Sequence, residues 1–513
     1  MKKKIMLSLL AAIALTACGG LSGNSDDESA AISSILKADE DGVKKTDVYD
    51  GSAVTVEFWH NAGANNQAMF KEFADEFKTL YPNITVNQVV KSGNYNDLEK
   101  AVKASIGAGS YPTMAYCYPD HVANYLDSGY VQDLEQLIDS NSPEIALSEE
   151  SRNDILTGAW EEGQSYKVGI RSFAFSKSTE ALFYDINYFT EHNLVMPEQP
   201  TWEQIWSLAD QIKTIDAAKT AGGRGIPFCY DSSDNLFITA SQQLGIPYTN
   251  TDGGILFNNA QAKEMVTYFR DQFTAGRFVV AKAISDSAYG SDFSKLIESE
   301  RNKDYNIRMY VGSTGGARYS QFASGYNAGI RAVPYFGTKL DGSVNNSADA
   351  KDQILQGPSI TIFQKANKQE TIAAWLYVKF MTNSLNSGRY SKLSGYAPIR
   401  HESFSLELPL ESVNAGQLVG ASVAWAFNED KSDAVPTVTG STLQLSEWNP
   451  TGQDKALADC IKLFDKSGDN MFTSAVFKKS SKTRDAVGAL FTQVLKGANI
   501  NSAFNSAEED AKF

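Results

Sequence analysis

A chain of 513 residues is too long for a single hydrophobic core, so we expect at least two lobes. Hydrophobic residues make up 42% of the chain, which is enough to fill several cores. Acidic residues outnumber basic ones by 61 to 46, and the net charge is -15. Because nucleic-acid binding requires a basic surface, this balance argues against a nucleic-acid partner.

The N-terminus has the pattern of an export signal. Three lysines at positions 2–4 precede an apolar stretch at 5–15, shorter than the roughly 20 residues that span a bilayer. Residues 15–18 end in Cys18 and resemble the lipobox of bacterial lipoproteins. This resemblance implies that residues 1–17 are removed and that Cys18 is lipidated. The protein would then be membrane-anchored in the cell envelope, on the extracytoplasmic side.

The next residues, 18–52, are rich in glycine, serine, asparagine and acidic residues, which predicts a flexible tether. The remaining cysteines are Cys117, Cys229 and Cys460, an odd number that cannot all pair with one another. They are either buried free thiols or one disulfide with a spare thiol. None has the spacing of a metal site, and we expect no metal and no cofactor.

The first folded unit is predicted over residues 54–90. Residues 54–58 alternate as in a half-buried strand, residues 69–81 have one apolar helical face, and residues 84–90 form a second strand. A strand, a helix and a strand at this spacing predict a right-handed parallel crossover. Ligands meet such sheets at the carboxyl ends of the strands, so residues 59–65, with His60, form the first candidate binding loop.

A second crossover follows, which predicts a doubly wound α/β sheet. Its parts are a helix at 96–108, a strand at 114–118 and a helix at 122–138. Residues 171–184 are predicted to be a strand that leaves one lobe for another. Further helices are expected at 205–215, 260–275, 371–383, 456–464 and 484–497, with strands at 305–311, 329–334 and 359–363.

Several fragments in this order resemble one family. The strand that ends at His60 and the segments 93–95, 178–185, 200–202, 326–334 and 395–399 resemble the bacterial extracellular solute-binding proteins of ABC importers. The resemblance is greatest to the group that binds maltose-type sugars and glycerol 3-phosphate, and it runs from residue 54 to about residue 400.

The resemblance implies a two-lobed α/β fold, each lobe a mixed, mostly parallel sheet flanked by helices, with a ligand cleft between them. We assign residues 53–173 and 313–362 to the first lobe and residues 174–312 and 363–513 to the second. The chain is expected to cross between lobes near residues 173–177, 311–313 and 362–365.

The resemblance also implies ligand contacts. Matched position by position, these are Tyr95, Ser178, Gly316, Gly357 and Tyr396, with Asp120 as a further candidate. Polar and aromatic loops add His60 and Asp231, because sugar sites need aromatic faces together with hydroxyl, amide or carboxylate groups.

The sequence leaves the ligand open. Glycerol-phosphate binders carry an arginine near the C-terminus, and residues 438–441, which match that place, contain none. A neutral oligosaccharide is therefore favoured, since an anion would lose a charge-assisted pair. Arg171, Arg318 or Arg331 could replace it, so glycerol 3-phosphate or a glycerophosphodiester is the alternative.

We expect a binding protein, not an enzyme. The four histidines are scattered, and the sequence has neither a G-x-S-x-G elbow nor a Walker-type phosphate loop. A surface lipoprotein glycoside hydrolase remains a competing interpretation, because it needs only two carboxylates. The expected partners are a small-molecule ligand, the permease subunits of an ABC importer and the membrane that holds the lipid, and the protein is expected to be a monomer.

Overall fold

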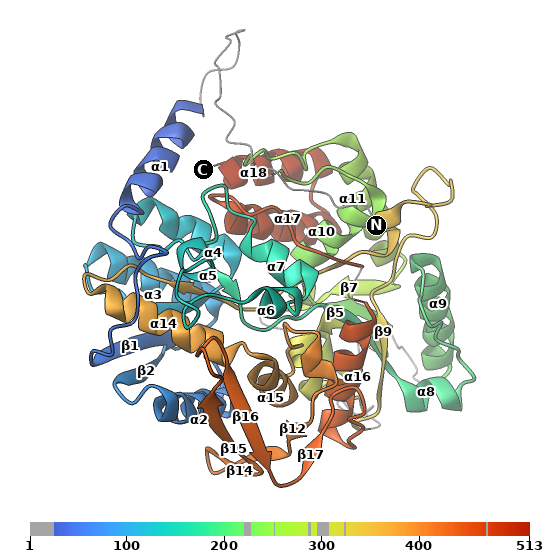
Figure 1. Ribbon diagram of the computed structural model, residues 1–513. Coiled ribbons are helices and arrows are strands. Elements are labelled where there is room, and N and C mark those ends of the chain that lie inside the picture. Colours follow the sequence, from blue (N-terminus) through green and yellow to red (C-terminus); the bar gives the residue numbers. More distant parts are fainter. Residues whose placement is uncertain are drawn as a thin grey trace, which may run out of the picture.

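The computed structural model describes residues 25–219, 227–250, 252–285, 289–294, 307–322, 325–467 and 470–512. Two five-stranded sheets, each covered by helices, form two lobes (Figure 1). This arrangement confirms the predicted two-lobed α/β fold. The predicted signal peptide and Cys18 lie outside the described residues.

The first lobe contains the predicted strand–helix–strand unit. Its sheet has the order β2 (Ile84–Val90), β1 (Val54–His60), β3 (Met114–Cys117), β11 (Ser359–Ile362) and β4 (Phe173–Ala174). β1 is parallel to β2 and β3, whereas β11 is antiparallel to β3 and β4. Helices of this lobe are α2 (Ala64–Leu80), α3 (Tyr95–Gly107), α4 (Pro119–Tyr125), α5 (Glu135–Ile138), α6 (Glu149–Asn153) and α7 (Thr157–Gly163).

The second sheet is buried on both faces. Its order is β7 (Phe278–Val280), β6 (Phe228–Tyr230), β8 (Met309–Ser313), β5 (Glu180–Asp185) and β9 (Ala328–Ala332). Leu182 and Tyr184 of β5 belong to one hydrophobic cluster, and Ala181 and Phe183 belong to another. Because alternate residues of a strand point to opposite faces, this sheet separates two cores.

Helices cover both faces of the second sheet. One core includes residues of α9 (Trp202–Lys219), α10 (Ser233–Leu244), α11 (Ala260–Thr274), α17 (Ser480–Leu495) and α18 (Ile500–Lys512). α16 (Gln453–Lys466) packs in the other core. Shorter elements of this lobe are α8 (Ile186–Glu191), α12 (Ala281–Ile284), α13 (Gly290–Ser294), η2 (Thr314–Tyr319) and η3 (Ala348–Lys351).

Three described segments cross between the lobes side by side. Ser178 exchanges two backbone hydrogen bonds with Gln356, at N···O distances of 2.6 and 2.8 Å. Lys177 exchanges two with Ala397, at 3.0 and 2.6 Å. The first of these segments overlaps residues 173–177, where a crossing was predicted. The other two predicted crossings are wrong: residues 311–313 belong to β8 inside the second sheet, and residues 362–365 follow β11 in the first lobe.

The structure also divides the chain differently from the predicted lobe boundaries. β9, assigned by sequence to the first lobe, pairs with β5 of the second sheet. Residues 368–439, assigned to the second lobe, pack largely on the first. There Arg389 is buried between Glu76 and Glu411, with N···O distances of 2.8 Å to each. Long-range strand pairing and buried ion pairs decide lobe membership, and local sequence does not reveal them.

This C-terminal part of the first lobe consists of two helices followed by hairpins. They are α14 (Lys368–Met381), α15 (Ser384–Ser394), η4 (Glu402–Phe404), β13 (Glu411–Asn414), β14 (Gln417–Gly420), β15 (Ser422–Phe427) and β16 (Ala434–Thr439). Trp375 of α14 is fully buried. Two further short pairs are β12 (Leu408–Pro409) with β17 (Thr442–Leu443), and β10 (Gln353–Ile354) with β18 (Met471–Phe472).

Residues 25–52 differ from the flexible tether that their composition predicts. They form helix α1 (Ser25–Ala38) and a segment that packs on the first lobe, next to η1 (Leu126–Ser128), with Ile35 and Val43 buried. The physical reason is long-range pairing, since Asp39 forms an ion pair with the buried Arg171.

The cysteine alternatives are also settled: Cys117, Cys229 and Cys460 are buried free thiols.

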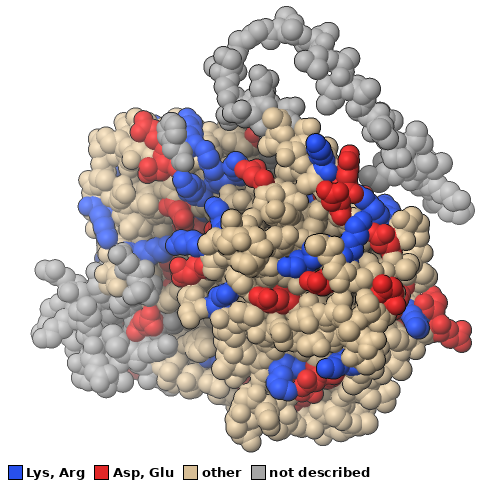
Figure 2. All heavy atoms as spheres, turned by 90° about the vertical axis from the view of Figure 1, so that its left-hand side faces the viewer, with Lys and Arg blue, Asp and Glu red and all other residues tan. Residues whose placement is uncertain are grey.

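Acidic and basic side chains alternate over the face that Figure 2 shows, and the described atoms there form no single-sign patch. The described part of this face therefore has the mixed charges of an ordinary solvated surface.

Candidate ligand-binding site

A cavity of about 260 Å³ lies between the lobes, beside the crossing segments. Both lobes contribute to its lining, and most of the lining groups are polar. The lining residues are Asn96, Tyr118, Pro119, Asp120, His121, Glu162, Ser232, Asp234, Asn235, Leu355, Gln356, Thr473, Ser474, Val476, Ser481, Arg484 and Asp485.

The first-lobe wall is set by α4. The helix begins at Pro119, and Asp120 lies in its first turn. The Asp120 carboxylate accepts a hydrogen bond from the Ser480 hydroxyl at 2.5 Å, which links α4 to the start of α17 across the lobes. Burial raises the pKa of Asp120, and the nearby Arg484 acts in the opposite direction.

The second-lobe wall is set by the close approach of α10 and α17. Arg484 donates hydrogen bonds to Asp234 at 3.1 Å and to Asn235 at 2.5 Å. Gly488 allows this approach, because a Cβ at that position would lie 3.2 Å from the Asp234 Cβ. The guanidinium therefore lies in the cavity already paired with one carboxylate.

A buried hydrogen-bond network connects this wall to a crossing segment. The side-chain amides of Asn235 and Gln356 exchange hydrogen bonds at 3.0 and 2.9 Å. Asn235 also donates to Glu180 at 3.0 Å, and the Tyr230 hydroxyl donates to the other oxygen of Glu180 at 2.5 Å. Burial raises the pKa of Glu180 to about 8. Movement of the crossing segment would thus disturb the cavity wall directly.

A lysine of the first crossing segment pairs with another carboxylate of the lining, that of Glu162. Glu162 forms an ion pair with Lys177 and accepts a hydrogen bond from Ser359 at 3.0 Å. Lys177 is fully buried, so this pair holds the first crossing segment against α7.

Tyrosines adjoin the cavity on the first-lobe side. The Tyr95 ring centroid lies 4.6 Å from that of Tyr118, which lines the cavity. The hydroxyl of Tyr116 lies 3.1 Å from that of Tyr390. Tyr95 and Tyr396 are close enough that each affects the other's pKa, while burial, the largest cause, raises both. Tyr116 and Tyr390 are buried in the core behind them, so the flat face next to the polar cavity comes from Tyr118, with Tyr95 packed against it.

The structure brings most of the predicted site residues near this cavity. Asp120 lines it, and Tyr95 and Tyr396 belong to the adjoining tyrosines. Ser178 and Gly357 lie on crossing segments, next to or paired with Gln356 of the lining. Gly357 has a φ of +121°, and a Cβ there would lie 2.4 Å from the Ser176 carbonyl oxygen, so its packing alone requires glycine.

The other three predicted residues lie elsewhere. His60 has 0% exposure in the first-lobe core and contacts Gln88 at 3.1 Å, and burial lowers its pKa to about 4. Asp231 accepts a hydrogen bond from the Gly290 amide at 2.5 Å, and burial raises its pKa to about 7. Gly316 lies in η2 with open space beside its Cα.

Sequence reasoning missed Arg484. Residues 438–441, where an arginine was sought, follow the hairpin strand β15 and include the end of β16. Arg484 is the last arginine of the chain, and no motif around it marks it as a site residue. The three arginines considered instead bind elsewhere: Arg171 to Asp39, Arg318 to Asp454 at 2.7 Å, and Arg331 to the Pro197 carbonyl at 3.0 Å.

Among the described residues, no group of three or more His, Cys, Asp or Glu side chains is placed to hold a metal ion. In the same part of the chain, no helix is both long and apolar enough to cross a bilayer.

Comparison with known proteins gives the family and the fold. The model of the family described as bacterial extracellular solute-binding protein matches residues 68–409. No curated protein sequence matches the chain.

Three solved structures illustrate the likeness in fold. The cyclic α-maltosyl-1,6-maltose binding protein of Arthrobacter globiformis is 15% identical, with a TM-score of 0.61, over 90% of this chain and 98% of that one. UgpB of Mycobacterium tuberculosis, in complex with glycerophosphocholine, is 14% identical, with a TM-score of 0.62, over 90% and 98%. Maltose-bound MalE3 of T. maritima is 12% identical, with a TM-score of 0.62, over 90% and 100%.

Proposed function

Because this chain belongs to the bacterial extracellular solute-binding proteins, we propose that it captures a carbohydrate, specifically an oligosaccharide, and delivers it to the permease of an ABC importer. The family implies a location outside the cytoplasm. The proposal includes a lipid anchor at Cys18, a monomeric state and no enzymatic activity.

The interlobe cavity is the observation that carries the proposal. Its walls come from α4 of the first lobe, from α10 and α17 of the second, and from a crossing segment. A ligand that touches both walls favours the closed state over the open one by its difference in affinity for the two. A membrane partner that recognises the closed form can then distinguish the ligand-bound protein from the empty one.

The chemistry of the walls supports a neutral polyhydroxylated ligand. Carboxylates and amides accept and donate hydrogen bonds to hydroxyl groups, and the tyrosine faces can pack against the C–H surface of a sugar ring. The carboxylates of Asp120, Asp234 and Asp485 outnumber the single guanidinium of Arg484 in the lining, and Asp234 already pairs with it. An anion would therefore meet net negative charge.

Arg484 favours a second candidate, the binding of glycerol 3-phosphate or a glycerophosphodiester. A phosphate group could replace Asp234 as the partner of the guanidinium, and bidentate binding to arginine is strong. This would require Asp234 to move away, at the cost of breaking an existing pair.

A thermal-shift screen of the purified chain would test the proposal. The panel contains maltose-type oligosaccharides, other glycans, glycerol 3-phosphate and glycerophosphocholine, and each mixture is analysed for cleavage afterwards. A saturable rise in melting temperature with an intact oligosaccharide supports the proposal, because a ligand that binds only the native state stabilises it. A rise with the phosphodiester alone supports the second candidate. Cleavage of a glycan would contradict both and indicate a glycoside hydrolase.

A further inference from the structure

The N-terminal strap, residues 25–52, is held on the first lobe by a buried ion pair. The Asp39 carboxylate accepts hydrogen bonds from both terminal nitrogens of Arg171, at 2.8 and 2.6 Å. Arg171 has 0% exposure and donates also to the carbonyls of Val168 and Val131, at 2.6 and 3.0 Å. Removing the strap would leave a buried cation without this partner, which is costly.

Backbone contacts continue along the strap. The Val43 amide donates to the Gln132 side chain at 3.0 Å, and the Val43 carbonyl accepts from the same side chain at 3.2 Å. Two residues further, Lys45 forms an ion pair with Asp139 at 3.0 Å and its carbonyl accepts from the Asn141 amide at 2.8 Å. The strap is therefore integrated into the lobe and does not merely lie on it.

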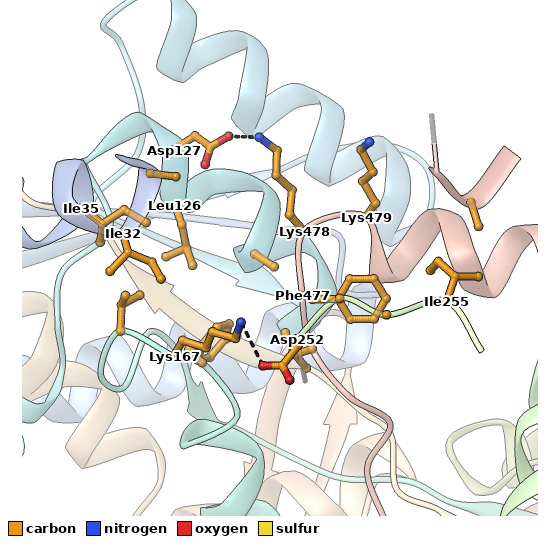
Figure 3. Close-up of a pocket in the computed structure, with 18 of the residues that line it drawn as sticks. Ile32, Ile35, Leu126, Asp127, Lys167, Asp252, Ile255, Phe477, Lys478 and Lys479 are labelled. Carbon is orange, nitrogen blue, oxygen red and sulfur yellow. Dashed lines mark hydrogen bonds and ion pairs between the residues drawn. The ribbon is translucent and has the colours of Figure 1, made fainter. Parts of the chain in front are cut away.

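Helix α1 brings the strap to the seam between the lobes. Ile32 and Ile35 face a cavity of about 750 Å³, and Phe477 and Ile255 line the opposite side (Figure 3). Ion pairs flank this cavity, Asp127 with Lys478 and Lys167 with Asp252, the latter at 3.3 Å. The C-terminal helix α18 ends at the same end of the molecule (Figure 1).

We propose that the strap shortens the lipid tether and fixes which end of the molecule faces the membrane. This inference rests on the proposed lipidation of Cys18. A free chain from residue 18 to residue 53 could reach about 120 Å, whereas the part between Cys18 and Ser25 spans at most about 24 Å. The docked strap thus keeps the α1 end, where both lobes meet, close to the membrane surface. The hairpin of β13 and β14 lies at the other end (Figure 1).

Hydrogen exchange on the purified full chain tests the docking without any substitution. We expect the amides of Val43 and Asn141 to exchange at least about 100-fold more slowly than unstructured peptide, because both are bonded between strap and lobe. Exchange of both at the unstructured rate would overturn the proposal.

Energy transfer to the membrane tests the orientation. The lipidated chain is reconstituted into phosphatidylethanolamine and phosphatidylglycerol vesicles that contain a fluorescent acceptor lipid. A donor dye is attached to D510C on α18 or to Q417C on β14, both exposed positions, while the three native cysteines that the structure describes are buried. We expect several-fold higher transfer from position 510. Equal transfer, or an intact mass without a diacylglyceryl group, would overturn the proposal.

A strap variant supplies the matched comparison. In D39A/V43D the strap loses its ion pair and its buried apolar residue, so the ratio of transfer from the two positions should fall toward one. D41A, at an exposed acid of the same strap, should keep the wild-type ratio. If D39A/V43D does not fold, hydrogen exchange and energy transfer measured on the wild-type chain still test the proposal. These measurements need no ligand, so failure of carbohydrate binding remains distinguishable from failure of the strap.

Discussion

The two walls of the interlobe cavity differ in chemistry. The first-lobe side is next to tyrosine rings, with Tyr118 in the lining and Tyr95 packed against it. The second-lobe side is charged, with Asp234 and Arg484 paired at its surface. The difference indicates that one wall supplies flat apolar contact and the other supplies directional hydrogen bonds. Substitutions in one wall at a time should show how much each wall contributes to the affinity for the ligand and to the selectivity among ligands.

The largest effect is expected on the charged wall. Arg484→Ala removes a guanidinium and leaves Asp234 and Asn235 without this donor, so affinity should fall by about 2 to 4 kcal/mol. Isothermal titration with the ligand identified by the screen measures it. Arg318→Ala is the matched control, because it breaks an ion pair with Asp454 outside the lining and should leave affinity unchanged. Equal losses in both variants would contradict the assignment of Arg484 to the site.

The tyrosine side should contribute somewhat less. Tyr95→Ala and Tyr396→Ala should each weaken binding by about 1 to 3 kcal/mol, through loss of ring contact. Tyr95→Phe keeps the ring and removes only the hydroxyl, so it separates packing from hydrogen bonding. If both alanine variants bind like the wild type, the tyrosines are packing residues and the proposed site must be revised.

A substitution in a crossing segment is expected to lower the free energy of unfolding. Gly357→Ala puts a Cβ 2.4 Å from the Ser176 carbonyl in a left-handed backbone conformation, so we expect a loss of about 1 to 3 kcal/mol in unfolding free energy. Gly316→Ala, where a Cβ meets nothing within 4 Å, should cost much less. Urea unfolding of the two variants gives the comparison, and similar losses would refute this explanation of Gly357.

The smallest expected effect is a pH dependence of the free energy of unfolding, caused by Glu180 beneath the charged wall. Burial raises the pKa of Glu180 to about 8, so the folded protein holds this proton more tightly than the unfolded chain does. The stability that results is complete below about pH 4.5 and is lost as the pH rises toward 8. Glu180→Gln should therefore reduce the fall in unfolding free energy between pH 5 and pH 8. An unchanged slope would show that Glu180 does not titrate in this range.

Local patterns explain which parts of the fold could be predicted. Residues 54–90 alternate and then follow a helical period, and the structure contains the expected strand, helix and strand there. Lobe membership could not be read in the same way, because β9 is placed by its pairing with β5 and α15 by the ion pairs of Arg389. The strap was predicted to be flexible from its composition, and its pairing with the buried Arg171 could not be read there because Asp39 and Arg171 are far apart in sequence.

The candidate site shows the same limit. Tyr95 and Tyr396 were predicted from the family resemblance, with Asp120 as a further candidate; Asp120 lines the cavity, and Tyr95 packs against Tyr118 of the lining. Arg484 has no local motif and reaches the cavity because α17 packs against α10, where Gly488 permits close contact. A side chain placed by the packing of two distant helices leaves little trace in a single sequence.

The central claim is that the interlobe cavity binds a neutral oligosaccharide. The most direct measurement is a pair of isothermal titrations of the wild-type chain, one with the oligosaccharide that gives the largest thermal shift and one with glycerophosphocholine. The proposal predicts saturable binding of the intact oligosaccharide in the micromolar range, about -8 kcal/mol, and none of the phosphodiester. Tight binding of glycerophosphocholine with no binding of the oligosaccharide would contradict it.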